Sequence, residues 1–136
     1  MDLYYLNYNS NIKVASVWIS GGSNKDSKDK KGINQILSSL LLRGCEGYDN
    51  FKLSDYIDSY GADLNCETFE DGILINLKSI NLYFKDVYPI LELIIDKPIL
   101  SKDQFKICKI NTNIYIKNSI ENPFIKAFEN WKKLVY

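Results

Sequence analysis

Three polar side chains stand at the spacing that a metalloenzyme uses for its ligands and its base. Gln35, Ser38 and Ser39 occupy positions i, i+3 and i+4 in the stretch GINQILSSLLLRGCEG, residues 32–47. In a helix, this spacing places them on one side. Amides and hydroxyls are neutral, weak metal ligands, so the stretch predicts a helix whose polar face carries no metal chemistry.

The composition removes most other hydrolytic mechanisms. The sequence contains no histidine, which excludes Ser-His-Asp triads, Cys-His dyads and His-ligated zinc. A nucleophile at Ser38 or Ser39 would need a base such as a buried lysine with a lowered pKa, and no spacing identifies one. The acids Glu67, Glu70 and Asp71 flank a predicted strand turn, where solvated side chains are the simpler interpretation than a cation site.

Length and charge predict one domain without an attraction for nucleic acid. Lys plus Arg and Asp plus Glu both number 17 in 136 residues, so the formal net charge is zero, and neither nucleic acid nor a membrane is an expected partner. The strongly apolar stretch 87–96 is interrupted by Glu92 and is too short to span a bilayer. The N-terminus lacks the pattern of a secretory signal, which predicts a cytoplasmic protein with free thiols at Cys45, Cys66 and Cys108.

The spacing of apolar residues predicts the elements that position these side chains. Three segments alternate with the period of a strand: 11–20, 62–69 and 71–80. Five segments have helical spacing: 33–43, 51–60, 83–96, 101–117 and 123–136. A charged, glycine-bounded stretch at 21–32 is a predicted solvent loop. This order predicts an α+β fold with two layers, a mainly antiparallel sheet with helices packed on one face.

The order and spacing of these motifs resemble the N-terminal part of one unit of the insulinase or pitrilysin-type metallopeptidases. The same unit occurs in mitochondrial processing peptidases and in the complex III core proteins. The resemblance rests on WISGGS, GINQILSSLLLRGC, YGADLNCETFEDGILI and ENPFIKAFENWKKLVY, and covers residues 11–136. It implies a metallopeptidase-like half unit and a single partial domain over residues 1–136, because the family unit continues through further strands.

In active members of that family, the helix that matches residues 35–39 carries an inverted zinc motif, His-x-x-Glu-His. The resemblance places the first histidine at Gln35, the catalytic glutamate at Ser38 and the second histidine at Ser39. Zinc hydrolysis needs imidazoles to hold the metal and a carboxylate to take a proton from its water. The resemblance therefore implies that all three roles are lost.

The third metal ligand of the family, a glutamate on a later helix, falls near Tyr115 in this sequence. No acidic residue occurs between Asp103 and Glu121, so a shift of a few positions restores no ligand. The resemblance thus implies a pseudoenzyme, a non-catalytic homologue that holds no metal and needs no cofactor.

One feature of the family requires no metal. In active relatives, the strand that matches GADLNCE is a sheet edge beside the cleft, on which substrate peptides add as an extra strand through backbone hydrogen bonds. This implies that Ala62, Asp63, Leu64 and Asn65 are candidate peptide-binding residues. An ordinary sheet strand without a ligand is the alternative interpretation.

The resemblance implies a catalytically inactive companion subunit, or half, of a zinc peptidase, which closes the chamber and contacts the substrate. The expected partner is a catalytic, zinc-bearing homologous subunit in a heterodimer, or a second copy by self-association, together with peptides. Two alternatives stay open. The chain could be a stand-alone structural or assembly module like the complex III core proteins, or a truncated fragment without independent activity.

Overall fold

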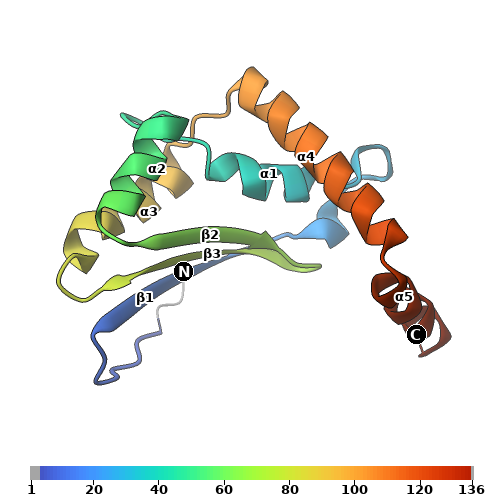
Figure 1. Cartoon of the computed structure of the whole chain (residues 1–136), viewed down its shortest axis with the longest axis horizontal. Coiled ribbons are helices and arrows are strands. Elements are labelled where there is room, and N and C mark those ends of the chain that lie inside the picture. The colour runs from blue at the N-terminus through green and yellow to red at the C-terminus, as the bar shows by residue number, and fades with distance from the viewer. Residues whose placement is uncertain (1–3, 136) are drawn as a thin grey trace. The chain divides into compact units, whose positions relative to one another are not determined.

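The computed structural model describes residues 4–135, apart from the side chains of residues 119, 120, 129, 132 and 133. The chain divides into two compact units, one ending at Leu100 and the other beginning at Ser101. The first unit contains a sheet and three α-helices, and the second contains two helices (Figure 1). The predicted α+β class is confirmed.

The sheet is antiparallel and has three strands in the described part of the chain. They are β1 (Ile12–Ser20), β2 (Asp63–Thr68) and β3 (Gly72–Ile80), in the order β1-β3-β2. A tight turn joins β2 to β3, where the Phe69 N–H donates to the Gly72 carbonyl at 2.7 Å. Because β3 pairs with both neighbours, β1 and β2 are the two edges of this sheet.

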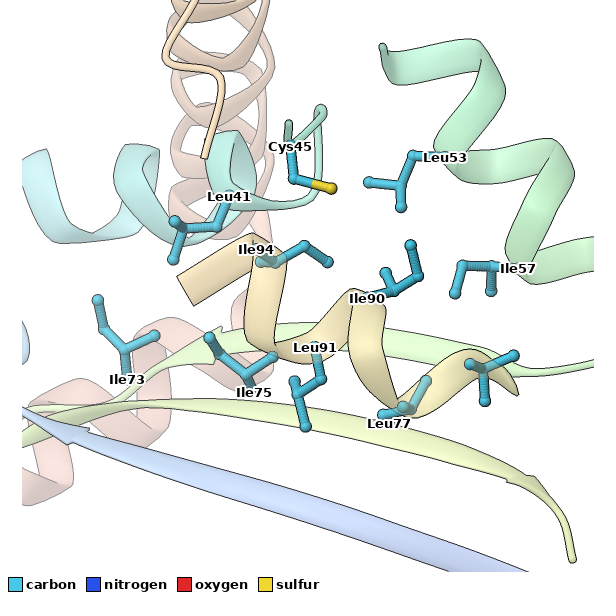
Figure 2. Close-up of a cluster of buried hydrophobic side chains, with 11 residues drawn as sticks. Leu41, Cys45, Leu53, Ile57, Ile73, Ile75, Leu77, Ile90, Leu91 and Ile94 are labelled. Carbon is cyan, nitrogen blue, oxygen red and sulfur yellow. The ribbon is translucent and has the colours of Figure 1, made fainter. Parts of the chain in front are cut away.

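Three helices cover one face of the sheet: α1 (Ile33–Leu41), α2 (Asn50–Ser59) and α3 (Phe84–Asp96) (Figure 1). Alternate side chains of β3 point toward them, because successive residues of a strand face opposite sides. Figure 2 shows the resulting core between β3 and the helices, whose buried members are Leu41, Cys45, Leu53, Ile57, Ile73, Ile75, Leu77, Val87, Ile90, Leu91 and Ile94.

The opposite face of the sheet is open. Ile12, Val14 and Trp18 of β1 are between 45% and 58% exposed on it. The Trp18 ring lies 5.8 Å from the ring of Phe69 and covers Gly72, where a Cβ atom would overlap the indole. Glycine is therefore the residue that lets the tryptophan lie flat against the end of β3.

The loop before α1 is more ordered than its charge suggests. It contains two single 3-10 turns, η1 (Ser23–Lys25) and η2 (Lys28–Lys30). Gly32 precedes α1 and offers no side chain, so the Asp26 carboxylate takes the capping role. It accepts from the Gly32 N–H at 2.6 Å and from the side chain of Asn34 at 2.6 Å.

The helix boundaries follow local signals with two adjustments. Pro89 lies inside α3, which starts five residues earlier at Phe84, one residue after the start of the predicted segment 83–96. In the second unit, α4 (Lys102–Glu121) extends past the predicted end at 117, because no helix-breaking residue precedes Asn122 and Pro123. α5 (Pro123–Val135) then begins with Asn122 accepting from the Phe124 N–H at 3.0 Å, as a capping residue does. None of the helices within residues 4–135 combines the length and the apolar character that a membrane crossing requires.

Candidate functional site

Two of the three polar side chains on this face of α1 form hydrogen bonds to the backbone of the same helix. Gln35 is exposed, Ser39 is half-buried and Ser38 is completely buried. The Oγ atoms of Ser38 and Ser39 both donate to the Gln35 carbonyl, at 2.9 Å and 3.2 Å. This is the local bond that serine makes inside a helix, and it leaves neither hydroxyl in contact with a base.

The residues that the structure describes form no arrangement that would hold a cation around these positions. Among the described residues, no group of three or more histidine, cysteine, aspartate or glutamate side chains is placed to hold a metal ion. Tyr115 lies on α4 in the second unit and is exposed. The acids at the β2–β3 turn, Glu67, Glu70 and Asp71, are also exposed.

A hollow of about 420 Å³ lies where α1, α2 and the start of β2 meet. Leu53, Ile57 and Leu64 supply the apolar part of its lining. Ser39 reaches it from α1, and Ala62 reaches it from the residue before β2. The hollow therefore brings one of the predicted motif positions, Ser39, together with three of the four predicted edge-strand residues, and Asn65 does not line it.

Charged side chains also line the hollow. Arg43 follows the last turn of α1, Asp58 lies in the last turn of α2, and Asp63 is the first residue of β2. Sequence reasoning missed Arg43 and Asp58. Their position in the sequence could have indicated them, because they lie near Gly44 and Gly61, the glycines at which the two helices beside the hollow end.

The free edge of β2 adjoins this hollow. Because Phe69 bonds to Gly72 across the turn, antiparallel alternation directs the backbone groups of Asp63, Asn65 and Glu67 toward β3. Leu64 and Cys66 then direct their N–H and C=O groups away from β3, at the open edge, while their side chains line the hollow. An added strand would find backbone partners and a side-chain pocket at the same residues.

Two further features set the chemistry of this edge. Burial, with a smaller contribution from Glu67, raises the pKa of the Cys66 thiol to about 11, so it stays protonated at neutral pH. The Asn65 amide oxygen is buried, and no hydrogen-bond partner for it lies within the described part of the chain. The site can thus bind through backbone and shape, but it holds no activated nucleophile.

Comparisons with known proteins identify the family and the fold of the chain. The family model for Insulinase (Peptidase family M16) matches residues 6–127. The fold is similar to the crystal structure of the peptidase M16 inactive domain from Pseudomonas fluorescens, with a TM-score of 0.75, 18% identity and 88% of this chain covered. The chain spans only 29% of that structure's chain. The search of curated proteins found no match. Since the family model covers most of the sequence, the chain belongs to the insulinase family of peptidases.

Proposed function

We propose that this chain is a non-catalytic member of the insulinase family that contacts peptides along β2, as the companion subunit or inactive half of a zinc peptidase. The observation that carries the proposal is the hollow of about 420 Å³, which adjoins both Ser39 on α1 and the free edge of β2. A peptide on that edge would lie beside the helix face where active relatives hold zinc. The similar Pseudomonas fluorescens structure is itself an inactive domain.

The loss of catalysis follows from what replaces the zinc motif. Gln35 is neutral and exposed, and the hydroxyls of Ser38 and Ser39 donate to its backbone carbonyl. Activating water requires imidazole ligands and a general base, which amide and hydroxyl groups do not provide. We expect isothermal calorimetry to detect no stoichiometric binding of zinc in the low micromolar range. A single tight zinc site would contradict this assignment.

The side chains around β2 define the class of peptide. A strand added to the edge places alternate side chains on the helix side, toward the apolar lining of Leu53, Ile57 and Leu64. Its other side chains lie on the open face beside Asp63 and Glu67, which are both exposed acids. The preferred ligand is therefore an extended peptide in which apolar and basic residues alternate.

Synthetic decapeptides test this preference directly. Fluorescence anisotropy should show that a peptide of alternating leucine and lysine binds at least about tenfold more tightly than one of alternating leucine and glutamate. N-methylation removes the donor that strand pairing needs, so methylating one alternate set of amides should abolish binding while methylating the other set is tolerated. Equal losses from the two methylated sets would contradict pairing along the β2 edge.

The companion role needs a separate experiment. Affinity capture of the chain from its native source, read by mass spectrometry, should recover a homologue that carries an intact His-x-x-Glu-His motif. Recovery of the chain with other proteins only would favour the alternative of a structural or assembly module. Peptide binding and partner capture are independent, so each part of the proposal can fail alone.

A further inference from the structure

Arg43 is the only cationic side chain among the described residues that line the hollow beside β2. Its side chain is half-buried. The ion pairs found within the described part of the chain join Lys97 to Glu46 and Lys106 to Asp103, so none of them compensates the charge of Arg43. Taking part of a charged side chain out of water is unfavourable when no opposite charge pairs with it. The guanidinium of Arg43 is therefore available to an anionic group of a ligand.

The backbone on both sides of Arg43 is held by hydrogen bonds. The Arg43 N–H donates to the Leu40 carbonyl at 3.0 Å, and the carbonyl of Gly44 accepts from the Ile99 N–H at 2.9 Å. Gly44 has a φ of 137°, and a Cβ atom there would lie 2.9 Å from the Tyr48 carbonyl oxygen, so this turn requires glycine. Arg43 thus extends from a fixed turn, which leaves less conformational entropy to lose when a ligand binds.

The same turn places Arg43 beside the start of α2. The Cβ position of Gly44 lies 3.5 Å from the backbone nitrogen of Asn50, the first residue of α2. Asn50 and Ser54 both line the hollow, and their i, i+4 spacing puts them on one face of the helix. A side-chain amide and a hydroxyl can each donate a hydrogen bond to a carboxylate. This end of the hollow therefore combines one cation with two neutral donors.

The acids that line the hollow belong to its other end. Asp58 follows Asn50 by eight residues, which is roughly 12 Å along a helix. α2 descends from the end of α1 to the start of β2 (Figure 1), where the Ala62 N–H donates to the Ile57 carbonyl at 3.1 Å just before Asp63. The apolar part of the lining lies between the two ends. The hollow is thus divided into a cationic end and an acidic end.

We propose that Arg43 determines the specificity of the peptide site by binding the carboxylate of an acidic side chain that enters the hollow. The planar guanidinium matches a carboxylate with two parallel hydrogen bonds. The inference rests on the peptide-binding function proposed for β2 and sharpens it. One of the peptide side chains on the helix side is acidic instead of apolar, while those on the open face remain basic. Glutamate suits this position better than aspartate, because it must reach from the sheet layer into the helix layer.

A series of peptides tests the charge position by position. In the decapeptide of alternating leucine and lysine, each leucine is replaced in turn by glutamate or by glutamine, which has a similar shape without the charge. Fluorescence anisotropy should show one leucine position at which glutamate binds at least about tenfold more tightly than glutamine. If the parent peptide binds and no position prefers glutamate, the role of Arg43 is wrong and the peptide-binding function stands. If the parent peptide does not bind, both proposals fail.

Two matched variants assign the preference to Arg43. Arg43→Gln should reduce the ratio of glutamate to glutamine affinity to about one, and this ratio is unaffected by a general change in peptide affinity. Lys52→Gln removes the same charge from an exposed position of α2 outside the hollow and should leave the ratio as in the wild type. A ratio that persists in Arg43→Gln, or that falls equally in Lys52→Gln, would overturn the proposal.

A conservative variant keeps the test decisive if circular dichroism shows that Arg43→Gln does not fold. Arg43→Lys retains the positive charge but lacks the planar fork, so it should lower the ratio only part of the way. An unchanged ratio in folded Arg43→Lys would show that the fork of Arg43 does not bind the carboxylate, and would equally overturn the proposal.

Discussion

The two edges of the sheet present the same backbone chemistry but different surroundings. β1 is nine residues long, carries one charge and has an open, partly apolar face. β2 is six residues long, carries two acids and adjoins a hollow lined by α1 and α2. Within the described residues, each pairs with β3 along one side only, so the backbone alone does not distinguish them. The acids and the hollow beside β2 distinguish it from β1, and the peptide preference proposed for β2 depends on those surroundings.

The substitution with the largest expected effect lies in β3, the strand that holds both edge strands in the sheet. Ile75 is completely buried at the centre of β3, where it faces Val17 of β1 and Cys66 of β2. Ile75→Ala should lower the free energy of unfolding by about 2 to 5 kcal/mol through lost burial and the cavity that remains. Urea denaturation measures the loss. Lys78→Ala, an exposed position on the same strand, is the control and should change stability by less than about 0.5 kcal/mol.

This variant also tests whether the edges depend on a common core. Peptide binding at β2 and the protection of β1 amides from hydrogen exchange should weaken together in Ile75→Ala, because β3 holds both strands in register. A variant that loosened one strand and left the other unchanged would show that the two edge strands are stabilised separately.

The next effect distinguishes the edges by the reactivity of a thiol. Cys66 is on β2, and burial raises its pKa from 9.0 to about 11. Its thiolate fraction at pH 8 is then about 100-fold below that of the unfolded chain, and alkylation by iodoacetamide should be slowed by a similar factor. The folded state holds this proton more tightly than the unfolded state. The contribution of this proton to the free energy of unfolding is therefore fully present below pH 9, and it is lost as pH rises toward about 11.

The measurement uses mass spectrometry to read alkylation at Cys66 in native protein and in urea. A bound alternating leucine and lysine peptide should slow native labelling further, because the peptide would cover the β2 edge. Rapid alkylation of the native thiol at pH 8 would contradict the burial of this side chain.

Sequence periodicity predicted the strands, the helices and the antiparallel pairing of β2 with β3, because these depend on residues close together in the chain. It did not predict that β1 pairs with the far side of β3, which joins Ile12 to Ile80. Nor did it predict the hollow, whose lining comes from the ends of two helices and the start of a strand. Arg43 and Asp58 lie near the helix-ending glycines Gly44 and Gly61 in the sequence, but only the folded chain brings both to one hollow.

A smaller loss of stability is expected from removing the cap of α1, the helix that packs on β2. Asp26 caps α1 through Gly32 and Asn34, and α1 packs on β2. Asp26→Ala should cost about 1 kcal/mol of stability and speed the exchange of amides in the first turn of α1. Asp29→Ala, on the same exposed loop, is the control. Equal stability losses in Asp26→Ala and Asp29→Ala would contradict the capping role of Asp26.

The smallest expected effect concerns the charge that separates the two edges. Glu67 is exposed on the open face of β2 and faces Leu74 in the register, whereas Asp63 faces Lys78, whose charge offsets part of its own. A single exposed cross-strand charge is worth about 0.2 to 1 kcal/mol. Glu67→Gln should therefore weaken binding of the alternating leucine and lysine peptide by up to about fivefold, and Asp63→Asn by less.

The difference between wild type and Glu67→Gln should shrink as ionic strength rises, because exposed charges are screened. Fluorescence anisotropy at low and high salt measures both quantities, with the leucine and glutamate peptide as the opposite-charge control. A larger loss in Asp63→Asn than in Glu67→Gln, or a difference that salt leaves unchanged, would mean that these acids do not select the ligand of β2.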